Sequence, residues 1–303
     1  MFKDFVQKDI SRNRQNVINI VASIVNFAVT TLIGFFMSPY IVKHIGVEAN
    51  GFVSLAHNFT SYAALATAAL NSMASRFLMM AYYNDEKKKV EKIYSSVFFA
   101  NLLLSVIMLV LSAIVVAQLE YILNVPSDIQ LGVKVLFATI FLNFNISTAI
   151  TSWATVPYIK NKLYLTSIAN VAGSVIKVGF IVLLFSCFVP SVSYVGVATL
   201  MATVVCIFYN YYCKKYLLDV RTRLESFSWS EIWVIISSGV WNSISSLGNI
   251  LIHGLDLLLA NVFLDATAMG VLAVAKTMPL LVGSLNETIA NVFTPYHRLC
   301  ERQ

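Results

Sequence analysis

Long apolar segments dominate this 303-residue chain, and short polar connections separate them. A hydrocarbon core about 30 Å thick takes about 20 residues of helix to cross, which matches these segments. Only a helix satisfies its own backbone in lipid, and the segments lack a period-two pattern. We therefore predict an all-α, polytopic membrane helix bundle. Its eight transmembrane helices are expected at residues 17–37, 51–73, 97–118, 133–156, 165–188, 195–212, 232–263 and 268–293.

Composition supports the bilayer as the solvent of this chain. Hydrophobic residues make up 58% of the sequence and charged residues only 12%, whereas average soluble domains carry about 25% charged residues. The net charge of +6 would suggest nucleic acid for a soluble protein. Here the basic residues lie between apolar segments, so we expect membrane lipids and no nucleic acid as partners. The four cysteines lack CxxC spacing, so we expect no disulfide framework, no metal site and no other cofactor.

Basic residues are concentrated in alternate connections, which predicts the orientation of the bundle. Cytoplasmic connections of membrane proteins are rich in lysine and arginine. The connections on the other side hold almost no cation, Lys43 being the exception. We therefore expect a multi-pass protein whose N- and C-termini both face the cytoplasm. The basic connections contain Arg12 and Arg14; Arg76, Lys87, Lys88, Lys89 and Lys92; Lys160 and Lys162; Lys214, Lys215, Arg221 and Arg223; and Arg298 and Arg302.

Glycine and proline predict interruptions in the helices. Pro39–Tyr40 is expected to end the first helix, and Gly46 lies in the linker 43–50 that follows. The stretch 232–263 is too long for one straight minimal span, so we expect it to bend or tilt strongly. It contains three glycines, which weaken a helix and let another backbone approach: Gly239, Gly248 and Gly254.

An internal repeat relates the first hairpin to helices seven and eight. The shift that places Gly51 on Gly270 superposes the two hairpins, although residue identity is low and the match lies in the architecture. Six helices separate equivalent points, which indicates a parallel repeat about an axis along the membrane normal. Residues 1–216 are then a six-helix lobe, and 217–303 begin a second lobe. A full second lobe would need about four to six more helices, so the chain is expected to be truncated.

Motifs in the first two helices resemble those of bacterial polysaccharide flippases of the O-antigen type. The matching stretches are PYIV at 39–42, IG at 45–46, NGF at 50–52 and ALNSMASRF at 69–77. This family belongs to the superfamily that includes multidrug and toxic compound exporters and lipid II flippases. The resemblance implies two six-helix lobes around a cavity. It also implies alternating-access transport of an undecaprenyl-pyrophosphate-linked oligosaccharide across the bacterial inner membrane, for surface polysaccharide such as lipopolysaccharide.

Polar residues inside the spans are the candidates for binding substrate, because charges are costly in a membrane. Lys177 and Lys276 are expected to line a cationic cavity that accepts pyrophosphate, since lysine acts as a mobile point charge for phosphate. Asn242 and Asn249 are expected to line the same cavity. The alternative for Lys276 is an ion pair with Asp256 at similar depth, and for Lys177 it is snorkelling or pairing with an absent helix.

Asp256 and His253 are the candidates for proton or sodium coupling. They lie one turn apart on one face of a helix. Histidine titrates near neutral pH, and a carboxylate within a membrane can relay protons. The alternative is a structural one, in which they form a hydrogen bond or ion pair between helices.

Three other functions are weighed against a flippase. A multidrug or cation antiporter would need acidic residues facing its cation, whereas Lys177 and Lys276 favour an anion. A membrane glycosyl or acyl transferase would need paired acids, an HxxxxD arrangement or a metal cluster, and the sequence contains none, so we predict no enzyme activity. The chain could also be an inactive truncated fragment.

Overall fold

The computed structural model describes residues 2–218, 220, 222–280 and 282–283, with side chains except those of residues 2–13 and His253. The described chain is helical, and no β-strand occurs within these ranges. The elements are α1 (Phe2–Tyr83), α2 (Lys87–Ala117), α3 (Leu119–Ile122), α4 (Gln130–Ala149), α5 (Thr151–Ala154), α6 (Val156–Ile159), α7 (Leu163–Cys187), α8 (Ser193–Leu217), the 3-10 turn η1 (Leu224–Ser226), α9 (Trp229–His253) and α10 (Leu255–Phe263), followed by a helix at Ala266–Leu280.

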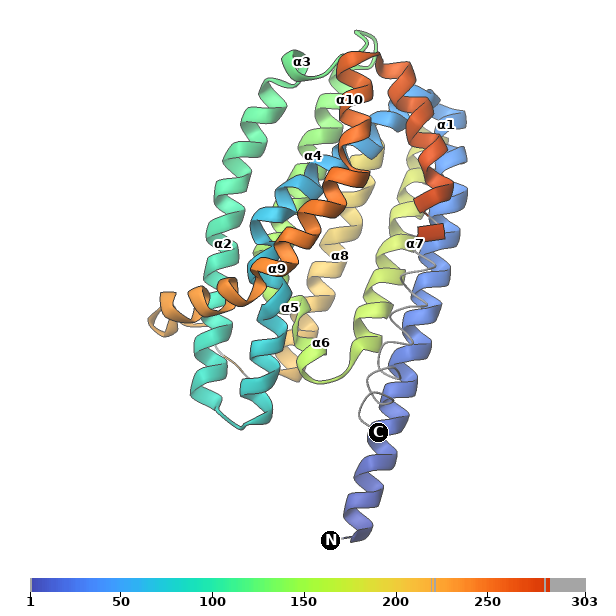
Figure 1. The fold of residues 1–303 in the computed structure, drawn as a ribbon. Coiled ribbons are helices and arrows are strands. Elements are labelled where there is room, and N and C mark those ends of the chain that lie inside the picture. Colours follow the sequence, from blue (N-terminus) through green and yellow to red (C-terminus); the bar gives the residue numbers. More distant parts are fainter. Residues whose placement is uncertain (1, 219, 221, 281, 284–303) are drawn as a thin grey trace.

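The helices run back and forth between two ends of a bundle (Figure 1). Six helices of the described chain are long and apolar enough to cross a membrane, and the 70-residue stretch Arg14–Tyr83 contains both of the first two predicted spans. Ala266–Leu280 is a shorter apolar helix that overlaps the first half of the eighth predicted span. The predicted all-α polytopic membrane bundle is therefore confirmed.

The first hairpin is broken at Gly46 and not at Pro39. The predicted helix end at Pro39–Tyr40 is wrong, because α1 continues through Pro39. Gly46 has φ 86° and ψ 167°, a conformation that glycine adopts without the steric cost paid by other residues. The chain reverses there, so the second half of α1 returns through the bundle (Figure 1).

The second hairpin breaks at the equivalent place. Helix α10 ends at Phe263 and the next helix begins at Ala266, so Asp265 lies in the break. Asp265 corresponds to Gly46 under the same shift that places Gly51 on Gly270. The predicted bend of 232–263 occurs at Gly254, which separates α9 from α10.

The fourth predicted span is the other segment that differs from expectation. The sequence predicts one helix over 133–156, but α4 ends at Ala149 and two single turns, α5 and α6, follow it. The separations lie at Ile150 and Thr155. Pro157 occupies the first turn of α6, where a proline without an N–H is tolerated and the preceding backbone cannot continue a regular helix.

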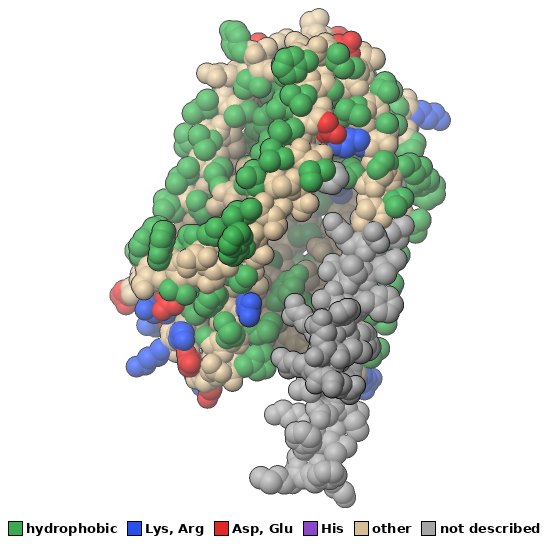
Figure 2. All heavy atoms as spheres, viewed as in Figure 1, with side chains coloured by type: hydrophobic (Ala, Val, Ile, Leu, Met, Phe, Trp, Pro, Cys, Tyr) green, Lys and Arg blue, Asp and Glu red, His purple; other side chains and the backbone are tan. Residues whose placement is uncertain are grey.

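Apolar side chains cover the middle of the molecule. Figure 2 shows hydrophobic side chains over most of the visible face and a cluster of charged side chains at its lower left end. Three ion pairs join acids and bases at that end, which we call the basic end: Lys89–Glu86, Lys92–Glu231 and Arg223–Glu91. An apolar band next to a charged end is the surface expected of a protein whose middle lies in lipid.

Candidate functional site

A polar stripe runs along the second half of α1. His57, Ser61, Ser72 and Arg76 are all exposed, and their spacing places them on one side of the helix. Leu55 and Ala56 beside them are fully buried. Exposed polar side chains within a membrane-spanning segment indicate contact with water, because lipid offers them no hydrogen-bond partner.

A second polar stripe runs along α9. Ser238, Asn242, Ser245 and Asn249 are exposed at intervals of three and four residues, so they share one face. The outward face beside this stripe is apolar and carries large side chains: Trp233, Trp241, Ile244, Leu251 and Ile252. Helix α9 is therefore amphipathic within the membrane region, and the predicted residues Asn242 and Asn249 lie on its polar side.

The two stripes face the same side because of how α1 and α9 cross. A Cβ atom on Gly239 would collide with the carbonyl oxygen of Ala69, so the two backbones meet with no side chain between them. With 3.6 residues per turn, the residues of each stripe lie about a quarter turn around their helix from the residue at the crossing, which is Ala69 in α1 and Gly239 in α9. Since the second half of α1 and α9 run in opposite directions (Figure 1), both stripes open to the same side. Figure 2 shows that the molecule is hollowed below α9.

Lys177 on α7 approaches the first stripe from across the bundle. Its ammonium is close enough to the His57 ring to act on it electrostatically. Lys177 is half-buried, and among the described residues it forms no ion pair. Two basic side chains from helices far apart in sequence, Lys177 and His57, therefore lie close together at the polar stripe of α1.

Lys276 is paired with an acid. Its Nζ lies 2.6 Å and 2.5 Å from the two carboxylate oxygens of Asp256. The predicted alternative for Lys276, an ion pair with Asp256, is thus what the structure contains. Two side chains of α1 anchor the backbone at Gly254, close in sequence to Asp256. Asn58 and Tyr62 both donate hydrogen bonds to the carbonyl oxygen of Gly254, at 3.0 Å and 2.5 Å.

Residues related by the repeat touch each other at the end of the bundle away from the basic end. A Cβ on Gly51 would lie 2.8 Å from Cα of Gly270, and Thr267 donates a hydrogen bond of 2.6 Å to Glu48. The same shift along the chain relates the members of both pairs. A residue that contacts its own equivalent lies on the two-fold axis that relates the copies.

A reciprocal pair of asparagines strengthens the same end. The backbone N–H of Asn124 donates to Oδ1 of Asn261 at 2.9 Å, and its side-chain amide donates to the Asn261 carbonyl at 2.8 Å. Asn261 returns a bond of 3.2 Å to the carbonyl of Asn124. The loop before α4 and helix α10 are therefore joined directly.

The structure brings some of the predicted residues together and leaves others apart. Asn242 and Asn249 share one stripe, and Asp256 and Lys276 form one ion pair, whereas the side chain of His253 lies outside the described residues. The sequence analysis missed His57, although the i, i+4 spacing of His57 and Ser61 within an apolar segment was a usable signal. Within the described ranges, no cluster of three potential metal-ligating side chains occurs.

Comparison with known proteins decides the family. The model of the family described as "Polysaccharide biosynthesis protein" matches residues 15–297. This chain belongs to the polysaccharide biosynthesis protein family. One curated relative is the uncharacterized membrane protein EpsK of Bacillus subtilis (strain 168), which is 30% identical over 92% of this chain. The chain spans 55% of the length of that relative.

Two solved structures share the fold of this chain. One is described as an inward-facing conformation of a multidrug resistance MATE family transporter of the MOP superfamily, with a TM-score of 0.67, 17% identity, and coverage of 85% of this chain and 61% of that one. The other is the MATE multidrug transporter DinF-BH in a ligand complex, with a TM-score of 0.58, 17% identity, and coverage of 91% and 63%. At this identity the likeness concerns the fold alone.

Proposed function

We propose that this protein translocates a lipid-linked oligosaccharide across a membrane, with the polar stripes of α1 and α9 lining the pathway. The observation that carries the proposal is that these stripes open to one side, with Lys177 near His57 of the α1 stripe. A sugar needs hydrogen-bonding groups along its path, and the serines and asparagines of the stripes provide them. Membership of the polysaccharide biosynthesis family supports a glycan as the cargo.

The basic side chains give the pathway a site for a phosphate group. His57 and Lys276 are related by the shift that relates Gly51 to Gly270, so they occupy equivalent positions in the two hairpins. Together with Lys177, they place basic side chains on both sides of the two-fold axis proposed for the two hairpins. Because Lys276 is neutralised by Asp256, Lys177 is the residue that we assign to the pyrophosphate of an undecaprenyl-pyrophosphate carrier.

Contacts at one end of the bundle support a mechanism of alternating access. The end away from the basic end is held by Gly51 against Gly270, Glu48 with Thr267, and the asparagine pair, while the hollow lies below α9 (Figure 2). We assign residues 1–216 to one lobe and 217–303 to the start of the second, which move about this contact. The basic end then faces the cytoplasm of a bacterial cell, with both termini on that side of the inner membrane.

Asp256 and His253 remain our proposal for coupling to a proton or sodium gradient. Asp256 pairs with Lys276, so protonation or ion binding at the carboxylate would release the lysine. This release would couple the ion gradient across the membrane to the positive charge that Lys276 offers to the substrate. Surface polysaccharide of the O-antigen type is the end product that we assign to this transport.

The test compares two lysines in the full chain reconstituted into vesicles. Lys177→Ala should lower the translocation of a fluorescent polyprenyl-pyrophosphate disaccharide at least tenfold, and Lys177→Arg should keep most of it. Lys134→Ala is the matched control, because Lys134 is a lysine of another predicted span that pairs with Glu120. Equal rates for Lys177→Ala and wild type would contradict the proposal.

A second arm of the experiment addresses drug export. Both structural relatives are described as multidrug transporters. A pathway with an available lysine and a neutralised acid should repel an organic cation. We therefore expect no gradient-driven uptake of ethidium, and uptake that Asp256→Asn abolishes would favour the multidrug function.

A further inference from the structure

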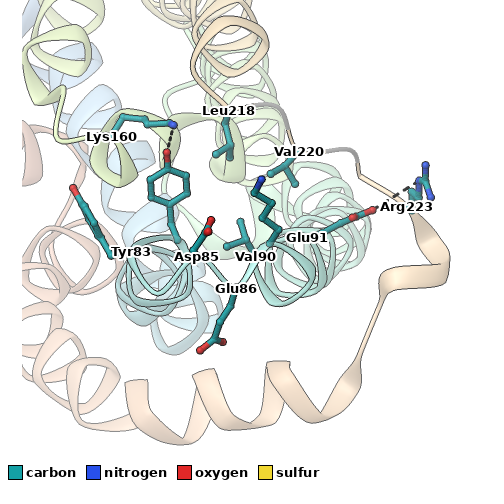
Figure 3. A pocket seen from close by; sticks show the side chains of 11 residues that line it. Tyr83, Asp85, Glu86, Val90, Glu91, Lys160, Leu218, Val220 and Arg223 are labelled. Carbon is teal, nitrogen blue, oxygen red and sulfur yellow. Dashed lines mark hydrogen bonds and ion pairs between the residues drawn. The ribbon is translucent and has the colours of Figure 1, made fainter.

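A pocket of about 760 Å³ lies at the basic end, where three connections of the chain meet (Figure 3). It is formed by the α1–α2 turn, by Lys160 after α6, and by the segment between α8 and η1. No residue of the two polar stripes lines it, so it is a different site from the proposed pathway. Its volume is in the range of small-molecule sites, about 300–1,000 Å³.

Three charged side chains of the pocket form no ion pair with any described residue. Within the described part of the chain, Asp85 and Lys87 form no ion pair, and Lys160 contacts no carboxylate. Lys160 instead donates a hydrogen bond to the hydroxyl of Tyr82 and lies 4.2 Å from the centre of its ring (Figure 3). The ring fixes the position of this ammonium, and no described carboxylate neutralises its charge.

The other charged groups around the pocket are already paired. Arg223 lies 3.8 Å from Glu91, and Glu86 lies 3.0 Å from Lys89. Figure 3 shows Glu86 pointing away from the other labelled side chains, whereas Asp85 points in among them. Among the described residues of the pocket, the unpaired groups are therefore two ammonium groups and one carboxylate.

Apolar and aromatic side chains complete the lining. Val90, Leu218 and Val220 come from two different parts of the chain and form an apolar patch beside the charges (Figure 3). Tyr83 adds an aromatic ring that is 65% exposed and so available for stacking. A ligand that fills this pocket needs a negative group, hydroxyl donors and a flat apolar part.

We propose that this pocket binds a nucleoside phosphate. Lys87 and Lys160 suit the phosphate, since lysine is a point charge for phosphate oxygens. Asp85 suits the ribose hydroxyls, whose hydrogen bonds a carboxylate accepts in dinucleotide sites. The apolar patch and Tyr83 suit the base, because bases stack on aromatic side chains whatever their sequence.

The bound ligand would act on the connection between the two hairpins. The segment after α8 is already tied to α2, because the backbone N–H of Arg223 donates to Ser95 at 3.2 Å and that of Ser228 donates to Ser96 at 2.8 Å. A ligand that contacts both Asp85 and Val220 adds a link between the α1–α2 turn and this segment. It therefore biases the position of α9, which carries one of the polar stripes.

The experiment measures binding to the purified full chain and does not depend on transport. UDP should bind saturably and raise the melting temperature by about 2–4 °C at saturation, while uridine and pyrophosphate alone should bind at least tenfold more weakly. Lys160→Ala should weaken UDP binding at least tenfold, and Asp85→Asn should weaken it with little effect on pyrophosphate. Glu86→Gln is the matched control and should leave UDP binding unchanged.

Any of three results would overturn the proposal. The first is the absence of saturable UDP binding to the folded wild-type chain, and the second is equal UDP binding by wild type, Lys160→Ala and Asp85→Asn. Pyrophosphate binding as tight as UDP would also reject a nucleoside site in favour of a simple anion site. If Lys160→Ala fails to fold, Lys160→Gln replaces it, since glutamine keeps a donor to Tyr82 without the charge.

Discussion

Two helices of this protein expose side chains within the membrane region, but they expose different kinds. Between residues 97 and 117, the exposed face of α2 is entirely apolar and includes Leu103, Val106 and Val110. The exposed side chains of α9 fall into an apolar face and a polar stripe that contains Asn242 and Asn249. Exposure alone does not distinguish lipid from water here, and the chemistry of the exposed residues does.

The comparison of α2 and α9 also separates polar residues that bond to a neighbouring helix from polar residues that do not. Helix α2 contributes buried polar residues that bond within the bundle, such as Asn101 to Asn71 and Ser105 to the carbonyl of Asn145. Among the described residues, Asn242 and Asn249 of α9 form no such bond to a neighbouring helix. The two helix-joining residues of α2 are thus buried, and the α9 residues assigned to the pathway are exposed.

The largest expected effect comes from placing the same charge on both surfaces. Val106→Lys puts an ammonium on the lipid face of α2 and should cost about 2.5–3.5 kcal/mol in membrane insertion. Asn242→Lys should cost much less, because that stripe faces water. Insertion of the two variants can be measured by protease protection or by the yield of folded protein. Equal costs would mean that α9 has no water-facing side.

The next largest effect concerns the crossing that turns both stripes to the same side. Gly239→Ala should destabilise the bundle by about 1–3 kcal/mol, because its Cβ would run into the carbonyl oxygen of Ala69. Gly248→Ala in the same helix is the control, since nothing lies within 4 Å of a Cβ there. Thermal unfolding in detergent should show a lower melting temperature for Gly239→Ala alone.

A moderate effect is expected from making the polar stripe apolar. Asn249→Leu should lower glycan translocation about tenfold, which corresponds to about 1.4 kcal/mol in the barrier, without changing the melting temperature. Trp241→Leu, on the apolar face of the same helix, should leave translocation unchanged. A loss of equal size for both variants would remove the distinction between the two faces of α9.

The smallest effect is expected at a polar residue that belongs to neither surface. Asn19 is buried in a part of α1 that is otherwise largely exposed, and it bonds to the carbonyl and the side chain of Asn161 at 2.9 Å and 3.1 Å. Asn19→Ala should cost about 1 kcal/mol, which is within the range for hydrogen bonds between membrane helices. Unfolding should shift slightly, and translocation should persist.

Hydropathy was enough to predict the bundle, because a lipid solvent imposes length and polarity on every span. The sequence placed Gly46 in the predicted linker 43–50, but it ended the first helix too early, at Pro39–Tyr40. Both Pro39 and Gly46 disrupt helices, but a membrane helix tolerates proline when its neighbours satisfy the freed carbonyl, whereas the conformation at Gly46 needs glycine. The choice between them depends on the tertiary structure.

The candidate site was predicted in part. Lys276 and Asp256 lie close in sequence and at similar depth, so their ion pair was among the predicted alternatives. The approach of Lys177 to His57 joins helices that are far apart along the chain, and no local pattern reports such a proximity. The three- and four-residue spacing of polar residues would have predicted both stripes, but the sequence analysis selected only the asparagines of α9.

Gly51 and Gly270 have a consequence for how this family can vary. Each is the counterpart of the other, and they meet face to face, so enlarging one closes the space that its twin also occupies. Natural variation at these two positions should therefore be tied together, with a bulkier residue in one copy accompanied by a shift of the other helix. Positions of the two hairpins that do not touch each other are free of this constraint.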